Sequence, residues 1–284
     1  MSILAEVLEH KKSEIESLDV HSFRRAAESS PAPRDFLAAI TLLPSEADPR
    51  VKLIAELKRA SPSKGILAPH LDLLEVADIY AQNGASAISV LTDEKFFMGT
   101  LQTLRELRFA RQIELPLLRK DFLIDEVQLY ESRANGADAI LLIAAALADD
   151  KHFADLHALA LELGLTPLVE VHNEADTERA LKLNNVHLIG INNRNLATFE
   201  VSLKTTERIR PMIPAEIAVV AESGIFAAQD VEQLAKANVD AILVGEALVT
   251  ANDVDAKVRE LSNVPLSEAR SLYSVKRDAS RSLS

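Results

Sequence analysis

The sequence predicts an α/β fold, a single domain built as a (β/α)8 TIM barrel with an extra N-terminal helical segment. Eight short apolar runs alternate with amphipathic segments of helical length from about residue 51 to the 260s. This alternation is typical of a parallel sheet covered by helices. One strand-entry pattern also recurs about every 50 residues, at residues 83–91, 135–143 and 238–245, with a weaker copy at 185–192. Four similar quarters favour a closed barrel over the alternative, a doubly wound open sheet.

The first 50 residues lie outside this repeat and predict the helical extension. Residues 3–17 (ILAEVLEHKKSEIES) place apolar side chains at helical spacing, and residues 29–36 (SSPAPRDF) indicate a loop before a further short segment. We expect residues 1–50 to pack on a barrel that spans residues 51–262. The tail, residues 263–284, is rich in Ser and Arg and is expected to form a last helix or a frayed end.

The predicted strands are the apolar runs themselves. They are expected at residues 51–57, 87–92, 115–120, 139–146, 166–171, 188–192, 218–223 and 241–245. Between them, the helical spacing of apolar residues is clearest at residues 72–85, 126–137 and 153–164.

Composition excludes several classes of function. The 284 residues carry a formal net charge of −12, which disfavours nucleic acid and anionic membranes as general partners. The chain has no cysteine, so thiolate chemistry is excluded. No apolar run reaches the ~18 residues of a membrane helix, and no basic region followed by an apolar stretch starts at Met1. We therefore predict a cytoplasmic protein.

Charged residues lie near the carboxyl ends of the odd-numbered predicted strands. They are Glu56 and Lys58 on the first, Lys120 on the third, Glu170 on the fifth and Glu222 on the seventh. Strands of a parallel barrel are buried on both faces, and their carboxyl ends form the face that holds the active site in such barrels. The structural alternative is a set of buried ion pairs or rim lysines, but burying ion pairs gains little stability. Five charges at matching positions favour proton-transfer chemistry.

The other strand ends predict an anion site. Asn192 and Arg194 follow the sixth strand, where an asparagine can donate to a substrate oxygen and an arginine can hold an anion. Residues 221–225 (AESGI) and 243–248 (LVGEAL) each place a glycine at the turn after the last two strands, and this pair of loops commonly binds phosphate in barrels. Two polar residues of the first loop are placed to close over the same anion, Ser61 and Lys64.

Other kinds of site lack their signatures. The seven histidines are scattered without metal-ligand spacing. No glycine-rich nucleotide loop follows a strand, and no nucleophile elbow is present. We therefore expect neither a metal nor a cofactor. Phe96, Phe97 and Phe122 lie near the predicted mouth, where they either pack or meet an aromatic substrate.

One stretch is specific enough to indicate a family. Residues 54–65 (IAELKRASPSKG) closely resemble the signature of the indole-3-glycerol phosphate synthases. The likeness continues in order through LTDEKFFMG, PLLRKDF, ADAILLI, PLVEVHNEAD, IGINNRNL and VAESGI, and it covers essentially residues 1–262. The length is similar to that of the single-function form, which has no fused isomerase domain.

The resemblance implies a carbon–carbon lyase (a carboxy-lyase) of tryptophan biosynthesis that needs no cofactor or metal. Its substrate would be 1-(2-carboxyphenylamino)-1-deoxyribulose 5-phosphate, an anionic aromatic sugar phosphate. The products would be indole-3-glycerol phosphate, carbon dioxide and water. Ring closure then needs a lysine acid at the ketone oxygen, and the loss of carboxylate and water needs a base and an acid near the new ring.

The resemblance also implies roles for residues. Lys120 matches the general acid of ring closure, and Glu170 matches its acid–base partner. The dehydration and the substrate anions are served by Glu56 and Lys58. Substrate and lysines are oriented by Asn192 and Glu222. The phosphate is expected on Ser61, Lys58, Ser223, Gly224 and Gly245, and the aromatic ring on Phe97, Phe122, Leu141 and Leu196.

One position departs from the family pattern. Glu246 follows Gly245 where many members have serine, and a carboxylate beside a phosphate is unfavourable. We expect Glu246 to point its side chain away and to contribute only its backbone N–H.

Two other functions remain open at this stage, a Schiff-base aldolase that uses Lys120 or Lys58 and a non-catalytic sugar-phosphate sensor. The sensor would need the phosphate loops but not the strand-end charges. For the assembly we expect a monomer, with a weak dimer as the alternative.

Overall fold

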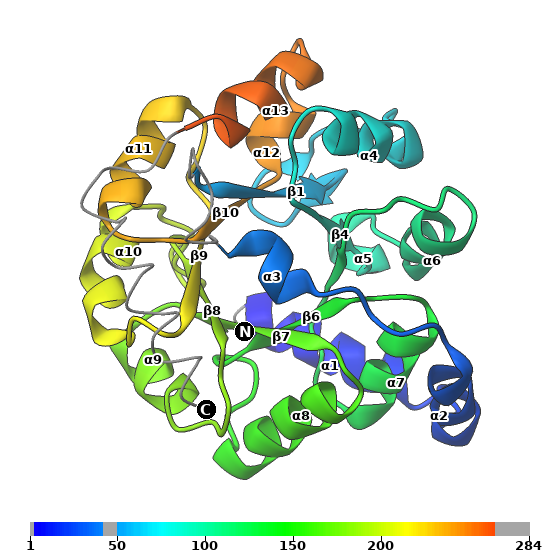
Figure 1. Ribbon diagram of the computed structural model, residues 1–284. Helices are drawn as coiled ribbons and strands as arrows, with labels where there is room; N and C mark the ends of the chain where they lie inside the picture. The colour runs from blue at the N-terminus through cyan, green and yellow to red at the C-terminus, as the bar shows by residue number, and fades with distance from the viewer. Residues whose placement is uncertain (1–2, 42–49, 265–284) are drawn as a thin grey trace.

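The computed structural model describes residues 3–41 and 50–264, and these form a closed barrel of eight parallel strands (Figure 1). Around the barrel the strands follow the order β1-β10-β9-β8-β7-β6-β5-β4, so each pairs with its neighbours in sequence and the first pairs with the last. They are β1 (Lys52–Leu57), β4 (Ala87–Leu91), β5 (Leu117–Lys120), β6 (Ala139–Ile143), β7 (Thr166–Val171), β8 (Leu188–Asn192), β9 (Ala218–Glu222) and β10 (Ala241–Val244). The predicted TIM barrel is confirmed.

Helices surround the barrel as an outer ring (Figure 1). They are α4 (Leu73–Gln82), α6 (Leu101–Phe109), α7 (Glu126–Ala134), α8 (Asp150–Glu162), α9 (Glu174–Ala180), α10 (Lys204–Ile209), α11 (Ala228–Lys236) and α13 (Val254–Ser262), with the 3-10 turn Arg210–Met212 after α10. Aspartate begins several of them, because its carboxylate accepts the free N–H groups of the first turn. Asp72, Asp125, Asp149 and Asp253 cap α4, α7, α8 and α13 in this way. No helix of the described residues has the length and apolar character needed to cross a membrane.

The N-terminal segment reaches both ends of the barrel, as the expected extension packed on it. It forms α1 (Ile3–Ile15), α2 (Val20–Ser29) and α3 (Phe36–Ile40). Helix α3 lies across the amino ends of the strands, where Phe36 and Ile40 are fully buried against the first residues of several strands (Figure 1). Helix α2 packs on α7, and α1 lies at the opposite end, over the carboxyl ends.

Alternation along the strands sorts side chains into two cores. On β1, Leu53, Ala55 and Leu57 face the helices, whereas Ile54 belongs to the interior of the barrel. The same alternation buries the interior residues Leu118, Leu168 and Val220 on β5, β7 and β9. The next interior position toward the carboxyl end is charged on all four strands. These charges form one four-residue layer of the kind that alternate strands build in such barrels: Glu56, Lys120, Glu170 and Glu222.

Some boundaries differ from the prediction. The run 139–146 is a strand only to Ile143, because the chain turns at residues 144–146. The run 115–120 enters the sheet at Leu117, after Pro116. Within the loop that follows β1, Ala60–Ser61 (β2) and Gly65–Ile66 (β3) pair as a short antiparallel hairpin. The predicted form of the tail lies outside the described residues from residue 265 onward.

Candidate active site

One pocket at the carboxyl end of the barrel is lined by the residues that the sequence placed at the site, with the exception of Lys64 and Phe96. Strand ends and the loops after them supply these residues, as barrel geometry requires. They are Glu56, Lys58, Ser61, Phe97, Lys120, Phe122, Leu141, Glu170, Asn192, Arg194, Leu196, Glu222, Ser223, Gly224, Gly245 and Glu246. Lys64, from the first loop, reaches the rim and pairs with Glu246 at 3.2 Å.

Lys120 occupies the centre of the charged layer. Its Nζ lies 3.2 Å from Glu170 Oε2 and 2.9 Å from Glu222 Oε2, and both carboxylates are buried. Burial alone would lower the pKa of this lysine, but attraction to Glu222, Glu170 and Glu56 outweighs burial and raises it. Lys120 therefore stays protonated across the physiological range and enters any reaction with its proton.

The two carboxylates beside Lys120 have opposite proton affinities. Burial raises the pKa of Glu222 to about 8, and Glu170 adds to this rise by repulsion while Lys120 opposes it. Burial also disfavours ionised Glu170, but Lys120 and His172 outweigh burial and hold its pKa below the usual range. At neutral pH the trio therefore holds an ammonium, a carboxylate and a carboxylic acid, with a net charge near zero. Titratable groups whose affinities are driven apart are suited to acid and base roles.

Gly190, a residue that the sequence argument missed, makes room for Glu222. It lies on β8 beside Glu170 of β7, and a Cβ at this position would collide with the Glu222 carboxylate. Gly245 likewise makes room for Glu56, because a Cβ at residue 245 would collide with the Glu56 carboxylate. Glycine in the interior of a strand is a sequence signal for such close approach, so Gly190 in LIGIN was open to detection.

Replacement of Gly190 by alanine is expected to push Glu222 away from Lys120. The new methyl group would also lie 3.2 Å from Leu168 Cδ1, so it has little space to move the other way. We expect kcat/KM to fall by about tenfold or more, as misplacement of a group at the chemistry costs activity. Steady-state kinetics and the thermal midpoint are the measurements. A folded Gly190→Ala protein with native kcat/KM would contradict this account of the glycine.

Glu56 and Lys58 form a pair at the end of β1. Lys58 Nζ lies 2.5 Å from Glu56 Oε1, and the Glu56 backbone oxygen accepts a hydrogen bond from Tyr80 at 3.3 Å. Glu56 is buried, whereas the Lys58 side chain is partly exposed toward the pocket. This pair can thus offer a fixed carboxylate and a cation that faces incoming anions.

The loops after β8, β9 and β10 form the anion side of the pocket. The side-chain oxygen of Asn192 accepts a hydrogen bond from the Arg194 backbone N–H at 3.0 Å. The NH2 group of Asn192 then remains as the donor of this side chain. Ser223 and Gly224 both have positive φ angles, 67° and 79°, so the chain turns sharply as soon as β9 ends. The Glu246 side chain pairs with Lys64 and lies 4.0 Å from Arg194 Nη2. The Glu246 side chain thus lies beside Lys64 and Arg194, two cations expected at the anion, and does not point away from them; the contribution of its backbone N–H stays a prediction.

Known proteins are similar to this chain in sequence. A sequence model described as indole-3-glycerol phosphate synthase matches residues 2–261. The chain belongs to the indole-3-glycerol phosphate synthase family.

Curated members of this family are similar along three quarters of the chain or more. An indole-3-glycerol phosphate synthase from Roseiflexus sp. (strain RS-1) is 48% identical over 270 residues, which are 92% of this chain and 98% of that protein. One from Dehalococcoides mccartyi (strain 195) is 53% identical over 213 residues, 75% of this chain and 82% of that protein. One from Polaromonas naphthalenivorans is 47% identical over 263 residues, 91% of this chain and 98% of that protein.

Solved structures of distant proteins share the fold alone. The 3-hexulose-6-phosphate synthase of Salmonella typhimurium has a TM-score of 0.60 at 14% identity, covering 80% of this chain and all of that one. The thiamine phosphate pyrophosphorylase of Pyrococcus furiosus has a TM-score of 0.55 at 20% identity, covering 75% and 94%. The function follows from the family model and the curated relatives, which favour the lyase over the aldolase and the sensor that the sequence left open.

His172, which the sequence did not single out, lies beside the candidate site and contacts Glu170. Its Nε2 lies 3.2 Å from Glu170 Oε1, and its Nδ1 lies 3.8 Å from Asp176 Oδ2. Burial lowers the pKa of His172, but the carboxylates of Glu170, Asp176 and Glu222 outweigh burial and raise it. His172 follows Glu170 by two residues, so the alternation of the strand could have placed it beside the same layer.

An apolar wall completes the synthase pocket. Phe97 and Phe122 lie with ring centroids 6.2 Å apart, next to Leu141 and Leu196. Helix α1 adds apolar side chains that the sequence argument did not assign to the site: Ile3, Leu4 and Val7. Their helical spacing was visible in the sequence, but nothing local indicates that this face covers the mouth. The pocket thus joins an apolar half to a charged half, and the described residues contain no group of His, Asp or Glu that could hold a metal ion.

Proposed function

We propose that Lys120, Glu170 and Glu222 carry the chemistry of indole-3-glycerol phosphate synthase activity, the carboxy-lyase step of tryptophan biosynthesis that family membership assigns to this chain. The substrate of that activity is a sugar phosphate. More specifically, we propose 1-(2-carboxyphenylamino)-1-deoxyribulose 5-phosphate. The observation that carries the proposal is the placement of the Lys120 ammonium within 3.2 Å of Glu170 and 2.9 Å of Glu222, two buried carboxyl groups that line the same pocket.

Ring closure makes use of the proton on Lys120. As the aromatic carbon attacks the ketone, Lys120 gives its proton to the oxygen that becomes a hydroxyl. Because burial raises the pKa of Glu222 to about 8, this side chain is mostly uncharged at neutral pH and holds the Lys120 proton less strongly than a carboxylate would. Glu170 faces the same space as a carboxylate and can accept a proton in the steps that follow. General acid–base catalysis of this kind contributes about 10²–10⁴-fold.

The remaining steps release carbon dioxide and water and restore the aromatic ring. Loss of the carboxylate gives CO2, and departure of the new hydroxyl as water requires a proton donor and an acceptor for the ring proton. The groups placed for this dehydration are Glu170 and the Glu56–Lys58 pair. Substrate, indole-3-glycerol phosphate, CO2 and water then balance with no outside oxidant or reductant.

Substrate binding divides between the two halves of the pocket. We assign the aromatic ring to Phe97, Phe122, Leu141 and Leu196. The phosphate is assigned to Ser61, Lys58, Arg194, Ser223, Gly224, Gly245 and the amide of Glu246. Asn192 lines the same pocket, and its NH2 group is assigned as a donor to a substrate oxygen. A pocket lined by both aromatic and cationic side chains suits a molecule with an aromatic end and a phosphate end.

A direct assay tests the function. The protein is incubated with the carboxyphenylamino-deoxyribulose phosphate, and indole fluorescence is followed. Turnover is expected without added metal or cofactor, and no product at any protein concentration would overturn the proposal. Borohydride added during turnover should trap no covalent adduct. A stable adduct on Lys120 or Lys58 would indicate Schiff-base chemistry instead.

Glu222 gives the reaction a predicted pH dependence. Below its pKa of about 8 this side chain is neutral, and above it a second negative charge appears beside Lys120. That charge strengthens the hold of Lys120 on its proton and repels an anionic substrate, so kcat/KM should fall above about pH 8. Glu222→Gln keeps a neutral side chain of the same shape and should lose this alkaline decrease. An identical decrease in both proteins would assign it to another group.

The net charge of the chain bears on its partners and its localisation. A net charge of −12 supports a small-molecule enzyme of the cytoplasm, with no nucleic-acid or membrane partner. We propose a monomer, with a weak dimer as the alternative. Sedimentation at two protein concentrations separates these states.

A further inference from the structure

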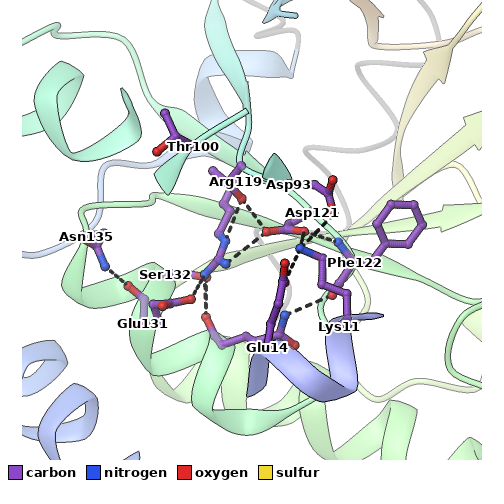
Figure 2. A network of polar contacts seen from close by, with 12 residues as sticks. Lys11, Glu14, Asp93, Thr100, Arg119, Asp121, Phe122, Glu131, Ser132 and Asn135 are labelled. Carbon is purple, nitrogen blue, oxygen red and sulfur yellow. Dashed lines mark hydrogen bonds and ion pairs between the residues drawn. The ribbon is translucent and has the colours of Figure 1, made fainter. Parts of the chain in front are cut away.

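Lys11, on the N-terminal helix α1, is a buried cation at the edge of the candidate active site. Its side chain is only 3% exposed, although α1 lies at the surface of the barrel. The ammonium group lies 2.9 Å from Asp93 Oδ2, 2.9 Å from Asp121 Oδ1 and 2.8 Å from Glu14 Oε2 (Figure 2). Three carboxylates from three segments of the chain thus meet at this lysine.

The two aspartates belong to turns that carry the aromatic part of the pocket. Asp93 follows β4 and caps the short helix α5 (Glu94–Phe97), accepting the Phe96 N–H at 2.7 Å. Asp121 follows Lys120 directly and accepts the Phe122 N–H at 2.8 Å (Figure 2). Phe97 ends the helix that Asp93 begins. Lys11 is therefore joined by ion pairs to the two segments that place Phe97 and Phe122.

Asp121 is fixed from its other side as well. Its Oδ2 accepts hydrogen bonds from Thr92 at 2.6 Å and from Arg119 at 3.1 Å. Arg119 in turn pairs with Glu131 of α7 at 2.8 Å (Figure 2). The network therefore runs from α1 through the end of β5 to the outer ring of helices.

Stability alone does not explain this arrangement. Desolvation of a buried lysine and its carboxylates cancels much of their attraction, and well-packed apolar residues often do as well or better. The same face of α1 already offers Val7, which is 1% exposed. What the charges add is a defined register, because α1 must bring Lys11 to both Asp93 and Asp121, whereas Glu14 belongs to α1 and moves with the lysine.

We propose that Lys11 is a positioning residue for the synthase reaction, which locks α1 onto the turns after β4 and β5. In this position Ile3, Leu4 and Val7 form the outer wall against the aromatic end of the substrate. The same contacts hold Phe97 and Phe122 beside Lys120. This inference rests on the proposed function, since it assigns the ring to the apolar half of the pocket.

The test is the variant Lys11→Met, which keeps the length of the side chain and removes its charge. We expect KM to rise about tenfold while kcat stays within about threefold, because the change loosens ring binding and leaves the acid and base in place. A competitive inhibitor that carries the aromatic ring should weaken to a similar degree. Inhibition by inorganic phosphate should be unchanged, because within residues 3–41 and 50–264 no hydrogen bond or ion pair of Lys11, Asp93 or Asp121 reaches the loops after β9 and β10.

Lys12→Met is the matched control. Lys12 is the next residue, its side chain is 63% exposed, and it pairs with Glu9 on the same helix. We expect native kinetics from it. If Lys11→Met has the native KM, the inference is overturned while turnover by the native chain still supports the proposed function. If both ligands weaken equally, the variant has a general defect and the positioning role is rejected.

A second variant separates positioning from charge balance. Lys11→Met leaves Asp93 without the cation that the structure pairs with it, so the thermal midpoint should drop. Adding Asp93→Asn removes the uncompensated charge and should recover much of that midpoint. KM should stay raised in the double variant, because α1 still lacks its lock. Return of KM to the native value together with the midpoint would contradict the proposal.

Discussion

Lys120→Ala is expected to lower kcat/KM by about 10³-fold or more, at the upper part of the range for loss of a general acid. The variant removes the proton donor from the centre of the charged layer, where Lys120 contacts both Glu170 and Glu222. The barrel should remain folded, because Glu222 is already neutral near pH 7 and Glu170 keeps His172 as a neighbour. Indole fluorescence measures turnover, and circular dichroism measures the fold.

The control for this variant is Lys151→Ala on α8. Lys151 is 83% exposed and pairs only with Asp155 in the described residues, so native kinetics are expected. Should Lys120→Ala prove unstable, Lys120→Met fills the same space without the charge. Retained turnover in a folded protein lacking Lys120 would rule out this lysine as the acid.

Glu170→Gln is expected to lower kcat by about 10²-fold or more, as loss of a general base does. The amide has the shape of the carboxylate and can still accept a hydrogen bond from Lys120, but it cannot take up a proton. The loss should lie mainly in kcat, because Glu170 is assigned to proton transfer and not to ground-state binding. Steady-state kinetics separate the two constants.

Glu174→Gln is the matched control for this change. Glu174 begins α9, four residues beyond the site in sequence, and its exposed side chain pairs with Arg208 at 2.9 Å. Its loss should leave kcat unaltered. If Glu170→Gln retained native kcat, the base would have to be sought elsewhere in the pocket, with Glu56 as the next carboxylate of the layer.

Strand alternation explains how much of the site was open to prediction. Buried parallel strands are apolar on both faces, so the charges Glu56, Lys120, Glu170 and Glu222 were conspicuous in the sequence. Because the strands are parallel, charges near their carboxyl ends lie at the same end of the barrel, and the alternation of side chains decides which of them face the interior. The motif from residue 54 to 65 then indicated the family, which the comparisons confirm.

The contacts across the barrel were not open to prediction. Strands β5, β7 and β9 are not neighbours in the sheet, so no pairing register brings Lys120 to Glu170 and Glu222. Their approach depends on the tilt and stagger of the closed barrel, which no local pattern encodes. The opposite proton affinities of the two glutamates follow from that approach and from burial.

The sequence by itself determined the barrel, its strand ends and the residue types at its mouth, because these depend on periodicity and on local chain direction. Only the tertiary structure decided that Lys120 lies between two carboxylates, that Gly190 leaves space for one of them, and that Lys11 joins α1 to the turns after β4 and β5. Such contacts join residues far apart in the chain. They exist only once the barrel has closed and the N-terminal segment has packed against its mouth.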